Sequence, residues 1–106
     1  MKGESIGELE ELVLLTIGSL RAECYAIVIL KEIQQHARRT LDVTAIHSVL
    51  RRLEKKGYVQ SKMGGATSER GGRRKRLFSL TTIGRSALEQ SMQLRITLYN
   101  RMLGVS

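Results

Sequence analysis

Cysteine and long apolar runs are both scarce in this chain of 106 residues, a length that suits a single domain. Cys24 is the only cysteine, so no disulfide can form within the chain, which fits a reducing compartment. No apolar run approaches the length of a membrane-spanning helix. The start, MKGESIGELEELVLL, carries acids where a signal peptide has a basic segment. We therefore expect a soluble, cytoplasmic protein with no membrane partner.

Motifs for catalysis and metal binding are also missing. The sequence contains no Ser-His-Asp or Cys-His signature, no phosphate-binding glycine loop and no metalloprotease motif. His36 and His47 are eleven residues apart, and neither has a second ligand at metal-binding spacing. We therefore expect no enzymatic activity, no cofactor and no metal site. A metal-sensing regulator stays open as an alternative, because Cys24, His36 and His47 could meet across a dimer.

Acidic residues are sparse in the middle of the chain, so most of the net charge of +8 comes from this segment. Residues 1–34 contain three Lys or Arg and six Asp or Glu, whereas residues 35–80 contain twelve and three. Residues 81–106 contain three and one. The middle segment thus carries all of the positive excess. A localised basic block predicts a polyanionic partner, either nucleic acid or an anionic membrane surface.

The spacing of the apolar residues predicts three helices, then two strands, then a last helix. Helical spacing occupies residues 8–20, 25–38 and 44–57, and Gly57 stops the third helix. The period changes to two over residues 58–63 and 74–80, and the polar, glycine-rich stretch between them predicts a β-hairpin with a long tip. The last helix is expected over residues 83–103, with Thr81 or Thr82 as its cap.

This order of elements predicts an α+β fold that is mostly helical. Three helices followed by a hairpin are the winged helix-turn-helix, which we expect over residues 1–81. Residues 82–106 are expected to form a C-terminal dimerisation helix, and the two parts form one structural unit.

The expected third helix has one apolar face and one polar face. Its core side contains Ile46, Val49, Leu50 and Leu53. The opposite side and its flanks supply the candidate DNA-binding residues Thr44, Ala45, His47, Ser48, Arg51, Arg52 and Lys55. Glu54 is the only acid in residues 43–57. A helix in the DNA major groove needs short polar groups near bases and longer cations near phosphates, so this face predicts a recognition helix.

The stretch SERGGRRKRLFSLTTIG, residues 68–84, concentrates cations beside paired glycines. Glycines allow a sharp bend and a close approach of the backbone to DNA. The candidate DNA-binding residues of this hairpin are Arg70, Arg73, Arg74 and Lys75. Phe78 and Leu80 share a face with Arg76, which lies nearer the tip, and they return the second strand to the core.

The apolar residues of the last helix cover more of its circumference than one core-facing stripe requires. We therefore expect part of this surface to meet a second copy of the chain. The candidate interface residues are Leu9, Leu88, Met92, Leu94, Leu98, Tyr99 and Met102. In the alternative, the helix packs entirely on its own core, or frays after Tyr99.

Four segments resemble the PadR family of bacterial transcriptional regulators, and together they cover nearly the whole chain. GELEELVLLTI (residues 7–17) resembles the family's first helix, and residues 25–33 resemble its second, with Ala26 at the usual glycine of a Tyr-Gly-x-x-Ile pattern. VLRRLEKKGYV (residues 49–59) is similar to the recognition helix and its exit, and ERGGRRKRLFSLTTIGRSAL (residues 69–88) to the wing and the start of the last helix. His47 stands where the family commonly has tyrosine.

The resemblance implies a homodimeric, usually repressing protein that binds double-stranded DNA, with a small-molecule effector as a possible control of its affinity. A dimer would require a pseudo-palindromic operator. A basic protein that binds polyanions without sequence preference is the remaining alternative.

Overall fold

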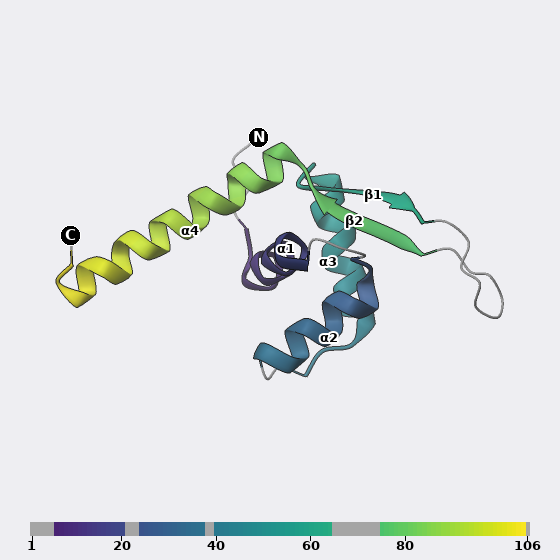
Figure 1. The fold of residues 1–106 in the computed structure, drawn as a ribbon, viewed down its shortest axis with the longest axis horizontal. Coiled ribbons are helices and arrows are strands. Elements are labelled where there is room, and N and C mark those ends of the chain that lie inside the picture. Colours follow the sequence, from purple (N-terminus) through teal and green to yellow (C-terminus); the bar gives the residue numbers. More distant parts are fainter. Residues whose placement is uncertain (1–5, 21–23, 38–39, 65–74, 106) are drawn as a thin grey trace.

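The structure, a computed structural model, describes residues 6–20, 24–37, 40–64 and 75–105. In chain order, the elements are α1 (Glu8–Leu20), α2 (Ala26–Ala37), α3 (Val43–Lys55), β1 (Val59–Met63), β2 (Arg76–Leu80) and α4 (Thr82–Leu103). Figure 1 shows three helices grouped beside a two-stranded hairpin, with α4 extending away from them. The predicted winged helix-turn-helix with a further C-terminal helix is confirmed.

The boundaries of α3 follow from its two caps. Asp42 is the N-cap, since its side chain accepts a hydrogen bond of 3.0 Å from the Ala45 N–H, so the helix begins one residue before the predicted Thr44. At the other end Gly57 has a φ of 83°, and the Tyr58 N–H donates to the Leu53 carbonyl at 2.9 Å. This arrangement satisfies the last carbonyls of the helix, as the predicted glycine stop requires.

The core lies where the three helices meet the root of the hairpin. Its fully buried side chains come mainly from α1 and α3, and α2 completes it: Val13, Leu14, Ile29, Ile46, Val49, Leu50 and Leu53. The apolar face predicted for the third helix is therefore confirmed. Burial of this face leaves the opposite side of α3 directed outward.

The hairpin is antiparallel, with Val59 opposite Leu80 and Ser61 opposite Phe78. Phe78 is buried, and its N–H also donates to the Cys24 carbonyl at 2.9 Å, on the edge of β2 that does not pair with β1. The hairpin is thus attached both to the core and to the residue pair that precedes α2. The predicted return of the second strand to the core is confirmed.

The junction before α4 is fixed by Thr81. Its hydroxyl donates to the Gly57 carbonyl at 2.6 Å and accepts from the Gly84 N–H at 2.9 Å. Its own N–H donates to the Tyr58 carbonyl at 3.1 Å. One residue therefore caps α4 and holds its start against the end of α3, and it decides between the two caps predicted from sequence.

The apolar packing of α4 on the body is confined to its first half. Leu88 is buried in the core, and Met92 is partly buried against it. Beyond these residues the helix leaves the body (Figure 1), and the molecule measures 56 Å along its longest axis against 32 and 22 Å along the others. Among the described residues, no helix is both long enough and apolar enough to cross a membrane.

The end of α4 is ordered by a glycine cap. Gly104 has a φ of 82°, and the Val105 N–H donates to the Asn100 carbonyl at 2.8 Å. The helix therefore continues to Leu103 and does not end at Tyr99, the point where the sequence allowed fraying.

Candidate nucleic-acid interface

The outward side of α3 presents the candidate residues on one continuous surface. Thr44, His47, Arg51, Arg52 and Lys55 are exposed, and Ala45 and Ser48 are half-buried. Ser48, Arg51, Arg52 and Lys55 together line one shallow hollow of about 520 Å³. The structure thus brings the short polar group and the three cations together, with no acidic side chain in this hollow.

A second, larger hollow of about 770 Å³ lies between α3, β2 and the start of α2. Its lining combines apolar side chains with the cations Arg51, Lys75 and Arg76, and also includes His47, Glu54 and Tyr25. The Lys75 ammonium lies 4.5 Å from the centre of the Tyr25 ring, a cation–π contact that holds this lysine beside α2. Sequence reasoning did not place Tyr25 at the site, although the residue opens the family-like pattern of the second helix.

Of the four candidate cations of the hairpin, the structure describes only Lys75; Arg70, Arg73 and Arg74 lie outside the described residues. Arg76 is exposed, and its guanidinium donates to the Ser61 hydroxyl at 3.0 Å. That hydroxyl in turn donates to Glu54 at 2.8 Å. The single acid of α3 is thus engaged with the hairpin, so its charge faces Arg76 and β1.

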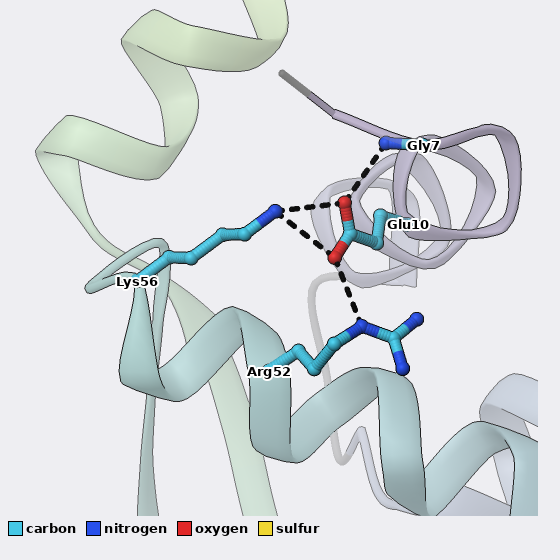
Figure 2. Close-up of polar contacts among 4 residues, drawn as sticks. All are labelled: Gly7, Glu10, Arg52 and Lys56. Carbon is cyan, nitrogen blue, oxygen red and sulfur yellow. Dashed lines mark hydrogen bonds and ion pairs between the residues drawn. The ribbon is translucent and has the colours of Figure 1, made fainter. Parts of the chain in front are cut away.

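Glu10 is a buried carboxylate that connects α1 to the C-terminal end of α3 (Figure 2). It is 5% exposed and accepts hydrogen bonds from Lys56 Nζ at 3.0 and 3.1 Å and from Arg52 Nε at 3.3 Å. The Gly7 N–H donates to the same carboxylate at 2.8 Å. Burial raises the pKa of Glu10, but the hydrogen bonds from Gly7, Lys56 and Arg52 and the Lys56 charge outweigh it and lower the pKa below its usual 4.5.

This contact changes how Arg52 is interpreted. Its Nε is used by Glu10, while about half of the side chain, 56%, stays exposed at the edge of the outward surface. Arg52 is therefore held in place by α1, whereas Arg51 and Lys55 form no such ion pair with the residues that the structure describes.

Glu11, the next residue, connects α1 to α4 instead. It is 9% exposed, and its Oε2 accepts from the Ser91 hydroxyl at 2.9 Å and from Arg95 Nε at 3.0 Å. Both glutamates lie in the first turn of α1, and the sequence alone indicates no partner on another helix for either. For Glu10 the spacing from Gly7 is the signal of a capping contact; for Glu11 no local signal exists, because its partners are 80 and 84 residues away.

The candidate interface residues of α4 divide into two groups. Leu94, Leu98, Tyr99 and Met102 are exposed, by 61, 51, 58 and 71%. Leu88, in contrast, is buried in the chain's own core, and Leu9 and Met92 pack against that core. The exposed members of this candidate set thus lie on the second half of α4, and Leu88 has little surface to offer a partner.

The three residues of the metal-sensing alternative, Cys24, His36 and His47, have different environments. Cys24 is buried, and its burial raises the thiol pKa to about 11. His36 lies 3.5 Å from Glu32 on the same helix, whereas His47 is on the outward side of α3. Within the described part of the chain, no three His, Cys, Asp or Glu residues are grouped so that they could hold a metal ion.

Solved structures with the same fold include several regulators. A PadR family transcription regulator from hypervirulent Clostridium difficile R20291 has a TM-score of 0.69 and 22% identity, over 92% of this chain and 99% of that one. A Streptococcus transcriptional regulator has a TM-score of 0.72 and 24% identity, over 91% and 89%. Bacillus subtilis PadR, solved in complex with operator DNA, has a TM-score of 0.68 and 15% identity, over 82% of this chain and 48% of that one.

Sequence comparison gives the family directly. No curated protein matches this sequence. The model of the transcriptional regulator PadR-like family matches residues 13–90, which include α2, α3, the hairpin and the start of α4. The family consists of transcriptional regulators and not of enzymes. With most of the chain matched, this protein belongs to the PadR-like family of transcriptional regulators.

Proposed function

We propose that this protein is a homodimeric repressor that binds a pseudo-palindromic DNA operator and places α3 in the major groove. The observation that carries the proposal is the outward surface of α3, where Ser48, Arg51, Arg52 and Lys55 line one hollow that contains no acidic side chain. Residues 1–81 would supply the DNA-binding part, and residues 82–106 the dimerisation helix.

The order of side chains along α3 fits this role. Thr44, Ala45 and Ser48 are short and lie toward the N-terminal end, where recognition helices contact base edges. Arg51 and Lys55 lie one and two turns further on and are long enough to reach phosphates or guanine edges. The hairpin follows directly, so Lys75 and the arginines before it would contact the adjacent minor groove or backbone.

The exposed half of α4 supports a dimer. Four large apolar side chains, Leu94, Leu98, Tyr99 and Met102, remain more than half exposed in the single chain. A two-fold interface would bury them against the partner's α4 and α1. It would also set two copies of α3 about 34–36 Å apart, one turn of DNA, which is why the operator would be pseudo-palindromic.

A small-molecule effector forms part of the proposal, which is supported by the hollow between α3 and β2. The hollow measures about 770 Å³, and His47 and Arg51 are among its lining residues. A ligand held there would compete directly with DNA for these side chains. The test is whether such a ligand displaces the protein from its operator and whether His47→Ala removes the effect.

The experiment that tests DNA binding is selection of a preferred site from a randomised duplex library, followed by footprinting. We expect a site with two inverted half-sites, one DNA turn apart, that is still bound in excess nonspecific DNA. Enrichment of no sequence, with binding that disappears equally on all duplexes as salt rises, would contradict the proposal. That result would instead identify a nonspecific polyanion-binding protein.

A further inference from the structure

We propose that Glu10 and Glu11 are positioning residues which together fix the angle between α3 and α4. Through that angle they would set the spacing between the two DNA half-sites that the protein accepts. This inference rests on the proposed function, because it concerns a dimer formed through α4 that reads DNA through α3.

The two carboxylates are adjacent in sequence but serve different helices. Successive residues of a helix point about 100° apart, so neighbours on α1 face different elements. Glu10 contacts Lys56 and Arg52 at the end of α3 (Figure 2), whereas Glu11 contacts Ser91 and Arg95 on α4. One turn of α1 is thus bonded to both helices at once.

Because the two carboxylates are buried, their contacts favour one orientation of α3 and α4 relative to α1. Glu10 and Glu11 are 5 and 9% exposed, so each carboxylate depends on its protein partners and has little access to water. A buried carboxylate that loses its partners is strongly destabilised, so a rotation of either helix that separates them is disfavoured. Apolar contacts alone would tolerate small rotations better, since they have no direction.

The length of α4 amplifies any change in angle. Its 22 residues span about 33 Å at 1.5 Å per residue. A tilt of about 10° at its start would move its far end by about 6 Å, which exceeds the rise of one base pair, about 3.4 Å. If the loss of the Glu11 contacts let α4 tilt by even this small angle, its far end would move by more than one base pair, which is the difference between one half-site spacing and the next.

A purely stabilising role for the two glutamates is the competing explanation. It predicts that their loss lowers the melting temperature and weakens binding to every duplex in the same proportion. A positioning role predicts a change in the preference among spacings, which general destabilisation does not produce.

The test uses the whole chain of 106 residues and the duplex that the wild type selects from a random library. Affinities are measured for this duplex and for versions with one or two base pairs inserted or removed at its centre. For each variant the readout is the ratio of the Kd on a shifted duplex to the Kd on the selected one. The variants are Glu10→Gln and Glu11→Gln, with Glu89→Gln as the control that removes the same charge from an exposed position on α4.

We expect the ratio to fall by about tenfold in both glutamate variants, within the range that coupling between sites usually spans, and to stay unchanged in Glu89→Gln. The salt dependence of binding by Glu11→Gln should match that of the wild type, because no phosphate contact is lost. If Glu11→Gln does not fold, Arg95→Gln removes the same ion pair by changing its exposed partner instead. Arg95→Lys keeps the positive charge and should restore the wild-type ratio.

A wild-type ratio in folded Glu10→Gln and in Glu11→Gln or Arg95→Gln would overturn the inference while leaving the proposed function intact. The same holds for affinities that fall equally on all spacings. A wild type that selects no two-half-site duplex would instead overturn the proposed function itself.

Discussion

Gly84 and Tyr58 lie so close that a Cβ atom at position 84 would overlap the Tyr58 carbonyl oxygen. The same carbonyl accepts the Thr81 N–H, so the first turn of α4 passes directly over the end of α3. Only a glycine permits this approach, because the obstructing atom belongs to the backbone and cannot rotate away.

Replacing Gly84 with alanine should therefore destabilise the protein by at least about 3 kcal/mol, the upper end of the usual cost of overpacking. Chemical denaturation gives the measurement, and Gly18→Ala is the matched control on another helix. There the added Cβ would meet only the Leu80 Cδ1 at 3.2 Å, the end of a side chain that can shift. Equal losses of stability in the two variants would contradict the close-approach argument.

Ser48→Ala and Arg51→Ala should weaken binding to the selected operator, because both side chains lie on the outward surface of α3. Loss of a base contact should cost about 1–3 kcal/mol and relax the preference at one base position. Lys31→Ala, which removes an exposed cation from α2, is the control in the same binding titration. The assignment of α3 as the recognition helix fails if all three variants bind like the wild type.

Replacement of Arg73 and Arg74 by alanine should lower the affinity for operator and for nonspecific DNA together. The slope of log K against log salt is negative, and each phosphate contact that is lost should make it less steep by about 0.9. Titrations at several salt concentrations measure this slope. An unchanged slope would show that these cations do not contact the backbone.

Leu94→Glu combined with Leu98→Glu should give a folded monomer that no longer binds the operator tightly. Both side chains are more than half exposed in the single chain, so the charges disturb a partner surface and not the chain's own core. Sedimentation gives the oligomeric state, and circular dichroism checks the fold. Leu88→Glu is the contrasting variant, and we expect it to unfold because Leu88 is buried. A double variant that still dimerises would refute the interface on α4.

The stability of the protein should fall in acid partly because of Glu10. Its pKa is lower in the folded chain than its ordinary value of 4.5, so its contribution is complete above that value and is lost as the pH falls through the folded pKa. Glu10→Gln should lower the stability at neutral pH and flatten its dependence on pH in this acidic range. Unfolding free energies measured from pH 7 downward decide this, and parallel curves for variant and wild type would contradict it.

The sequence predicted the order of the elements because each element carries a local signal. The apolar face of α3 and the stop at Gly57 depend on neighbours a few residues away, and both are confirmed. The start of α3 was placed one residue late, since Thr44 and Asp42 are both cap-forming residues and only the bond to Ala45 distinguishes them.

The contacts that orient the helices could not be predicted in the same way. Glu10 meets its partners 42 and 46 residues later, and Glu11 meets Ser91, so no window of the sequence contains both members of a pair. Leu88 was assigned to a partner surface because periodicity shows that a helix has an apolar face but not what covers it. The close approach at Gly84 is equally invisible, because its obstacle is the backbone of Tyr58.

The hydrogen bond from the Phe78 N–H to the Cys24 carbonyl has a consequence for how the molecule opens. A two-stranded hairpin alone is at best marginally stable in water, and its amides would exchange with solvent through brief local separations. Here the Phe78 ring is in the core and its amide is bonded to the segment before α2, so β2 cannot separate without disrupting the helices. The root of the hairpin therefore belongs to the same cooperative unit as the three-helix body, and the Phe78 amide should exchange as slowly as amides in the centre of α3.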